Sequence, residues 1–392
     1  MLTPLPAGMP NAAAVAAAEL AQACRRFVDR HIVPAEPALA GSDADGLLAG
    51  LAGAARQAGL WGAFHPGGRL DRLQDYLAVA EQEGRSEFGP TVFGSDTALD
   101  ARLLERYGSA AVRARFLPPL LRGEAVASYA MSEPDGVGSM PSTIATTARR
   151  VDGGWRIDGR KWFICRADRA SFVTVVARSG EDGGRARLSM LLVPADAPGF
   201  RIVREQAVLG RVQGQCELAF DGVRVPDDHL LGELHQGLTL MHWRLGLGRV
   251  LRSAQWLGLA RRSVELMLAR IAAPRGRLAD LAGKQLIRRH VFESELAIRS
   301  ARALLAEAAG LLDDGGDGEV AVNLAKVAAS RALCQAADSA VQVWGAEGLC
   351  DRSPLSGIYR AARATRILDG TDEALINAVG KQLIRSGAGV PA

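Results

Sequence analysis

Cysteine, aromatic side chains and charge of one sign are all scarce in this sequence. Aromatic residues make up 5% of the 392 residues, and the formal net charge is only +4. Such a weak charge argues against a nucleic-acid groove. The odd number of cysteines and the lack of a CxxC pair argue against a disulfide framework and against a metal site. The cysteines are Cys24, Cys165, Cys216, Cys334 and Cys350.

Long apolar runs are also missing. None approaches the ~20 residues that a membrane span needs. The alanine-rich opening has no basic stretch before a compact apolar core, and acidic Glu19 interrupts it, so a secretory signal is not indicated. We therefore expect a reduced, cytoplasmic protein with no integral membrane segment, whose partners are small molecules.

The pattern along the chain predicts three domains of an α+β, mostly helical fold. Helical spacing from Ala12 to about Arg122 predicts an N-terminal helical domain, residues 1–124. Short alternating runs, such as Trp155 to Ile157 and Ser171 to Val176, predict a central antiparallel β domain, residues 125–235. We expect Asp158-Gly159 and Asp221-Gly222 to form its tight hairpin turns.

The last part, residues 236–392, shows long amphipathic patterns that predict a C-terminal four-helix bundle. Helices this long are stable chiefly through packing side by side. The four patterns cover Leu238–Ile271, Gly283–Leu312, Glu319–Val343 and Glu373–Ser386.

Two segments of the β domain have the composition of a ligand-binding surface. Tyr129 to Ser139 is rich in Gly and Ser, whose backbone and hydroxyls can approach a cofactor closely. A polar turn between domains explains it equally well. In the second segment, Trp162 and Phe163 precede Cys165 on a predicted strand. One ring could pack on a flat cofactor while the other enters the core, although core filling is the simpler reading for both.

Two further segments lie in the helical C-terminal part. Gln342 to Gly348 has the form of a helix end, which either simply stops the helix or receives a nucleotide. Asp369-Gly370-Thr371 joins two helical segments and offers either a helix cap or a carboxylate base beside a small residue. The apolar pair Ile367-Leu368 before it could exclude water. Arginines recur at a spacing of three just upstream, which favours a solvated helical face; they are Arg360, Arg363 and Arg366.

In this order the four segments resemble the acyl-CoA dehydrogenase family over almost the whole chain, from about Arg25 to Ile384. The family's Thr-Glu-Pro segment is similar to Ser132-Glu133-Pro134, its aromatic-Ile-Thr/Ser strand to Phe163-Ile164-Cys165, and its Gln-x-x-Gly-Gly turn to Gln342 to Ala346. Its Glu-Gly-Thr corresponds to Asp369-Gly370-Thr371. The residues of these motifs are most similar to those of one subgroup, whose members are often fused to a phosphotransferase-like kinase domain. That subgroup also has Asp before Gly.

The resemblance implies an FAD-dependent enzyme of fatty acid metabolism that dehydrogenates an acyl-CoA or acyl-carrier-protein thioester. Asp369 would remove the α-proton, and flavin N5 would take the β-hydride. An electron-transfer flavoprotein is the common electron acceptor in the family, and a homodimer or homotetramer is the common assembly. Substrate contacts would come from Ser139, Arg249 and Gly370. Cofactor contacts would come from Tyr129, Met131, Ser132, Gly138, Ser139, Phe163, Cys165, Arg275, Gln342, Gly345, Ala346, Thr371 and Glu373.

The chain departs from the family pattern at several of these positions. Asp369 is one methylene shorter than the usual Glu, and Gly248 stands where a related group carries its base. Pro274 falls on the Arg of the family's Arg-x-x-Phe-Gly, so that Arg275 lies one residue late. Cys165 replaces a hydroxyl, and Ala346 the second Gly. Two other readings therefore stay open: a flavin monooxygenase of the same fold, or a non-catalytic partner subunit with a degraded FAD site.

Overall fold

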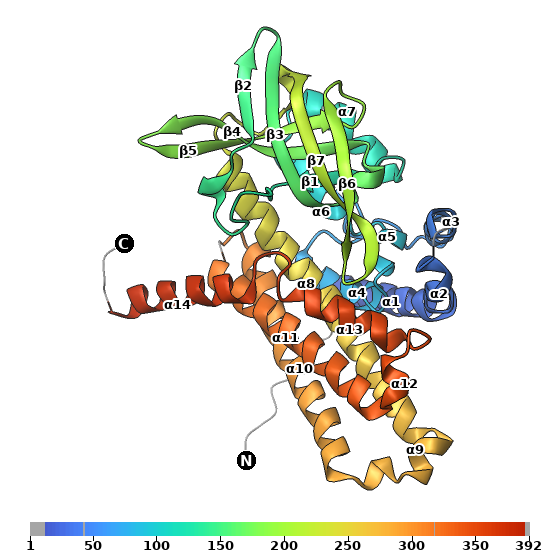
Figure 1. Ribbon diagram of the computed structural model, residues 1–392. Coiled ribbons are helices and arrows are strands. Elements are labelled where there is room, and N and C mark those ends of the chain that lie inside the picture. Colours follow the sequence, from blue (N-terminus) through green and yellow to red (C-terminus); the bar gives the residue numbers. More distant parts are fainter. Residues whose placement is uncertain (1–11, 42–43, 317, 389–392) are drawn as a thin grey trace. The chain divides into compact units, whose positions relative to one another are not determined.

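The computed structural model describes residues 12–41, 44–316 and 318–388, and Figure 1 shows their helices and strands. The chain forms two compact units. The first, called the helical unit below, comprises Met1–Ser95, Arg249–Ile367 and Leu375–Ala392. The second, called the β unit, comprises Asp96–Gly248 and Leu368–Ala374. The long helix α8 (Gly237–Ala272) passes from the β unit into the helical unit.

The helical unit is held together by long helices that pack side by side. Helices α10 and α11 pack along each other, and α13 packs on α11. The buried face of α11 is dominated by alanine, from Ala325 to Ala340, so that neighbouring helices can approach closely. The helices are α1 (Ala12–Phe27), α2 (Glu36–Leu39), α3 (Ala44–Gln57), α4 (Leu73–Glu83), α5 (Gly89–Val92), α9 (Pro274–Leu278), α10 (Gln285–Asp313), α11 (Glu319–Trp344), α12 (Ala346–Leu349), α13 (Pro354–Thr365) and α14 (Asp372–Ala388).

The β unit contains one mixed sheet, in the order β6-β7-β3-β2-β4-β5-β8. Most pairs are antiparallel, but β4 pairs in parallel with both β1 and β2. One apolar cluster packs α6 (Ala98–Tyr107) and α7 (Ala110–Arg122) on the sheet, and a second fills the space between its strands. The strands are β1 (Ala127–Ala130), β2 (Thr147–Val151), β3 (Gly154–Cys165), β4 (Phe172–Asp182), β5 (Arg185–Pro194), β6 (Phe200–Val208), β7 (Arg211–Pro226) and β8 (Leu230–Leu231).

The fold class predicted from the sequence is confirmed, and the four long helical patterns match α8, α10, α11 and α14 closely. The predicted hairpin turns are wrong. Asp158-Gly159 lies inside β3, and Asp221-Gly222 inside β7. The ladder between the two strands is irregular there, and the Asp158 carboxylate accepts a hydrogen bond of 2.9 Å from Gly222 N instead. The positive φ of Gly222, 66°, serves this bulge rather than a hairpin turn.

Among residues 12–41, 44–316 and 318–388, no helix is both long and apolar enough to cross a membrane. Nor do these residues contain a group of three or more His, Cys, Asp or Glu side chains arranged to hold a metal ion. The five cysteines are free thiols.

Candidate active site

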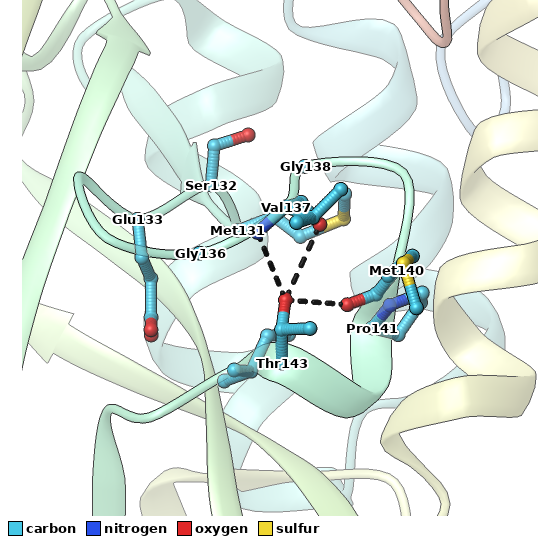
Figure 2. Close-up of a pocket in the computed structure, with 10 residues that line it drawn as sticks. Met131, Ser132, Glu133, Gly136, Val137, Gly138, Met140, Pro141 and Thr143 are labelled. Atoms are coloured by element: carbon cyan, nitrogen blue, oxygen red, sulfur yellow. Dashed lines mark hydrogen bonds between the residues drawn. The ribbon is translucent and has the colours of Figure 1, made fainter. Parts of the chain in front are cut away.

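The loop after β1 carries the first predicted cofactor segment, and the Thr143 hydroxyl shapes it. Thr143 Oγ1 accepts a hydrogen bond from Val137 N (3.0 Å) and donates to carbonyls of the same loop, 2.8 Å away at Met140 (Figure 2). The loop lines a narrow pocket with Ser132 and Gly138. In Figure 2 the side chains of Ser132 and Glu133 point to different sides of their segment.

Several hydroxyls of this loop remain available to a ligand. Within the described part of the chain, Ser132 and Ser139 make no side-chain hydrogen bond, and the buried Tyr129 hydroxyl has no partner. Burial raises the pKa of Tyr129, so the phenol stays a neutral donor. A Cβ at Gly138 would lie 3.6 Å from Ser132 Oγ, an ordinary contact, so packing does not require glycine there.

A bulge at the end of β3 presents the second segment. The pairing of β3 with β7 shifts between Lys161 and Ile164, and Phe163 adopts a left-handed φ of 51°. Phe163 is 47% exposed and its ring lies 4.9 Å from that of half-buried Trp162. The reading that both rings fill the core is therefore wrong. Bulges commonly re-aim side chains near functional sites, and this one offers an aromatic face to a flat ligand.

Cys165 ends β3 and is half-buried. Its carbonyl accepts a hydrogen bond of 2.8 Å from the Ser128 hydroxyl, and Gln215 Nε2 lies 4.0 Å from its Sγ. The first contact comes from β1 and the second from β7, both strands of the same sheet. The thiol is thus held at the strand end beside the first segment.

Asp369 lies in a short turn between α13 and α14. Its φ of 56° is left-handed, and Gly370 follows with φ 101°. The Thr371 hydroxyl accepts a hydrogen bond from Ala374 N (3.2 Å). Thr371 therefore caps α14. Residues 368–374, Glu373 included, belong to the β unit together with both cofactor segments.

The apolar pair before the base does not exclude water in the single chain. Ile367 is 56% exposed and Leu368 40% exposed. A Cβ at Gly248 would lie 3.3 Å from Leu99 Cδ1, so a larger residue at this position would require the Leu99 side chain to move.

The remaining predicted residues lie in the helical unit. Arg275 forms an ion pair with Glu347, which also pairs with Arg270 at 2.6 Å. Glu347 directly follows the turn that ends α11, where Gly345 adopts φ 69° and donates to Val341 O. The structure thus places Arg275 beside the predicted adenine turn of Gln342, Gly345 and Ala346. Elsewhere in this unit, Arg249 Nη1 donates to Asn323 Oδ1 at 3.0 Å.

Of the arginines upstream of Asp369, Arg363 is exposed, and Arg360 and Arg366 are half-buried. Arg360 pairs with Asp351 at 3.2 Å. Arg363 and Arg366 line a groove of about 570 Å³ between α11 and α13, together with Arg331.

A buried charge network beside the two cofactor segments is absent from the sequence prediction. Arg166 follows Cys165 with φ 62° and binds Asp96 (3.3 Å) and Asp100 (3.2 Å). Asp100 also binds Arg244 at 2.9 Å, and Arg244 stacks 3.9 Å above the Tyr129 ring. An acid among the apolar positions of α6 was the sequence signal for it. The network fixes the chain on either side of the cofactor segments.

Comparisons with known proteins identify the family. Profiles of the acyl-CoA dehydrogenase N-terminal, middle and C-terminal domains match residues 16–124, 128–223 and 235–384. The acyl-CoA dehydrogenase FadE2 of Mycobacterium tuberculosis is 34% identical over 83% of this chain and 83% of its own. The chain belongs to the acyl-CoA dehydrogenase family.

Another relative is acyl-CoA dehydrogenase family member 11 of Mus musculus, 31% identical over 93% of this chain. The match covers 50% of that protein, so the chain spans about half the length of this curated relative. A solved acyl-CoA dehydrogenase structure from Mycobacterium abscessus is 31% identical, with a TM-score of 0.86 over 96% of this chain and 99% of the other. The FAD complex of PigA, at 20% identity and a TM-score of 0.80 over 98% and 99%, shares the fold. FAD, the ligand named for PigA, is also the cofactor predicted from the sequence of this chain.

The residues present fit an FAD molecule. A flavin needs an aromatic or apolar face and hydrogen-bond partners for its ring edge. The exposed Phe163 ring and the buried, unpartnered Tyr129 hydroxyl supply both within the β unit. The Arg275 guanidinium supplies a cation for phosphate in the helical unit, although Glu347 now shares it.

Proposed function

We propose that this chain dehydrogenates an acyl thioester between its α and β carbons, with Asp369 as the base that takes the α-proton. When bound, FAD supplies the acceptor for the β-hydride. The observation that carries the proposal is the turn at Asp369: a carboxylate in a left-handed conformation beside glycine, directly before the helix that Thr371 caps.

In this proposal the described residues divide the work. Ser132 and Cys165 lie against the flavin ring, and Ser139 contacts the pyrophosphate or the CoA end. Tyr129, Met131, Gly138 and Phe163 complete the cofactor surface.

The other residues serve the base, the substrate and the adenine half of the cofactor. Thr371 and Glu373 hold the cofactor near the base. Gly370 leaves space for the substrate, and Arg249 lies near the mouth of the substrate site. Arg275 and the turn of Gln342, Gly345 and Ala346 receive the adenine end of FAD from a second copy in a homodimer or homotetramer.

The thioester arm is CoA or a carrier protein, and an electron-transfer flavoprotein is the proposed electron acceptor. Similarity to acyl-CoA dehydrogenase family member 11 over its matched half supports an acyl-CoA as the substrate.

The decisive experiment combines the visible spectrum of the purified protein with anaerobic bleaching by a panel of acyl-CoAs. We expect a yellow protein that at least one acyl-CoA bleaches. Asp369→Asn should keep the flavin but lower the bleaching rate by about 10²- to 10⁴-fold, the usual range for a general base. The matched control is Asp351→Asn, an exposed acid paired with Arg360, which should bleach at the wild-type rate.

Two results would count against the proposal. A colourless protein that cannot be reconstituted with FAD excludes a flavoenzyme. Bleaching that survives Asp369→Asn unchanged removes Asp369 as the base.

A further inference from the structure

Beneath the first cofactor segment lies a buried ion pair that the chemistry proposed above does not use. The side chain of Lys161 on β3 is 0% exposed and that of Glu133 is 6% exposed. Lys161 Nζ donates to Glu133 Oε1 at 2.8 Å. Burial lowers the pKa of Lys161 to about 8, although Glu133 opposes the shift. Burial also works against the charge of Glu133, but Lys161 and hydrogen bonds hold its pKa below the usual value.

The pair is tied to the backbone on both sides of Ser132. Lys161 Nζ also donates to Met131 O at 2.8 Å, and the next residue on β3, Trp162, donates its N–H to Ser132 O at 3.0 Å. Two consecutive carbonyls of the cofactor segment are therefore fixed to β3. The Ser132 hydroxyl itself takes no part in these bonds.

The same carboxylate closes the far end of the loop. Glu133 Oε2 accepts from Ala145 N at 2.6 Å, and Oε1 accepts from Thr146 N at 2.9 Å. With Lys161, Glu133 thus receives three hydrogen bonds, and the segment from Met131 to Thr146 is pinned at its beginning and its end. Lys161 stands two residues before Phe163 on the same strand. The Lys161–Glu133 pair therefore connects the two cofactor segments.

Stability alone gives a poor account of this arrangement. Two charges lose their hydration when they are buried, and a well-packed apolar pair is often as stable or more stable. What an apolar pair lacks is direction: it cannot orient the Met131 carbonyl and the N–H groups of Ala145 and Thr146. The charges therefore serve to fix the orientation of the loop.

We propose that Lys161 and Glu133 are positioning residues for FAD: they hold the Met131–Ser132 backbone so that the Ser132 hydroxyl and the Phe163 ring meet the flavin. This inference rests on the proposed function, because it concerns the same cofactor site. It adds two residues with no predicted contact to FAD.

The test measures FAD affinity and folding stability separately, on apoprotein. Glu133→Gln and Lys161→Met should each weaken FAD binding by at least about tenfold, the effect of a lost oriented hydrogen bond, and alter the visible spectrum of the bound flavin. The matched control is Glu81→Gln, which breaks a pair of similar length, 2.7 Å, with Arg302 in the helical unit. Its FAD dissociation constant should stay within about twofold of wild type.

A double variant, Lys161→Met with Glu133→Met, separates positioning from mere stability. A neutral apolar pair should recover the unfolding midpoint that either single variant loses, and it keeps the test decisive if the single variants fail to fold. FAD affinity should remain weak in the double variant.

Recovery of wild-type FAD affinity and spectrum by the double variant, or wild-type affinity in both single variants, would overturn the inference. Neither result contradicts the proposed function. The proposed function would instead be contradicted by wild-type protein that binds no FAD.

Discussion

Asp369 has a backbone conformation that few residue types adopt. Its φ of 56° lies in the left-handed region, where Cβ crowds the following carbonyl oxygen. Asp and Asn tolerate this region better than other non-glycine residues because their short polar side chains bond locally. Strained positions of this kind collect at functional sites. The conformation therefore restricts which substitutions test the carboxylate without disturbing the turn.

The first prediction concerns that restriction. Asp369→Asn should change the free energy of unfolding by less than about 0.5 kcal/mol, since Asn keeps the left-handed preference. Asp369→Val should cost about 1–2 kcal/mol, because a β-branched side chain is disfavoured at positive φ. Urea unfolding of the two variants measures the difference. Equal stability of the two would show that the turn relaxes to an ordinary φ.

Phe163 combines a left-handed φ with a half-exposed ring, so its side chain contributes little to folding. Phe163→Gly should relieve about 1–2 kcal/mol of backbone strain while losing a ring contact with Trp162 worth about 0.5–1.5 kcal/mol. We expect unfolding stability to stay within about 1 kcal/mol of wild type and FAD affinity to fall. Calorimetry and flavin titration measure the two effects. A large loss of stability with unchanged FAD affinity would make Phe163 a packing residue.

At the scale of elements, the network of Arg166, Asp100 and Arg244 joins the end of β3 to helices α6 and α8 within the β unit. Asp100 is 1% exposed, so its carboxylate is the shared acceptor of two buried cations. Such a residue stabilises the fold mainly because its removal leaves charges without a partner.

Asp100→Asn should therefore destabilise the β unit by about 3 kcal/mol. The matched control is Asp221→Asn, since the Arg201–Asp221 pair is exposed and should contribute less than about 1 kcal/mol. Urea denaturation of both variants gives the comparison. Similar small losses in the two would mean that water solvates the network around Asp100.

The same scale shows which elements the sequence could predict. Long helices such as α10 and α11 have one apolar face repeated over many turns, so their residues alone define them. Hairpin turns were wrongly predicted at the Asp-Gly pairs that begin at residues 158 and 221. An Asp-Gly pair suits a hairpin turn and a β-bulge equally well, and the pairing with the neighbouring strand decides which of the two forms. The bulge at Phe163 has no local signal for the same reason.

At the scale of the whole molecule, the predicted site residues fall into two groups. Asp369 and both flavin segments fold into the β unit, while Arg275 and the turn at Gln342 fold into the helical unit. The sequence predicted both groups because the order of their motifs resembles that of the acyl-CoA dehydrogenase family. The sequence did not predict the supporting pair Lys161–Glu133, because neither residue indicates that its partner lies 28 positions away. A lysine on the same face of β3 as buried Trp155 and Ile157 was the one available signal.

The acid sensitivity of the helical unit follows from Glu295, which ties α8 to α10. Its hydrogen bonds with Arg261 lower its pKa to about 2, aided by Arg299 and opposed by burial. The ordinary value is 4.5, so the unfolded chain takes up a proton between pH 4.5 and 2 while the folded chain does not. The unfolding free energy from this residue is therefore complete above pH 4.5 and is lost as the pH falls towards 2.

Glu295→Gln should accordingly be less stable than wild type at pH 7, and the difference should shrink progressively below pH 4.5. Urea unfolding at pH 7, 5, 4 and about 3 measures the unfolding free energy of both proteins, and the two values should approach each other as the pH falls. Glu293→Gln, on the same helix and paired with Arg289 only at 3.6 Å, is the control and should follow wild type throughout. A gap between Glu295→Gln and wild type that stays constant down to pH 3 would mean that the carboxylate acts through packing and not through its charge.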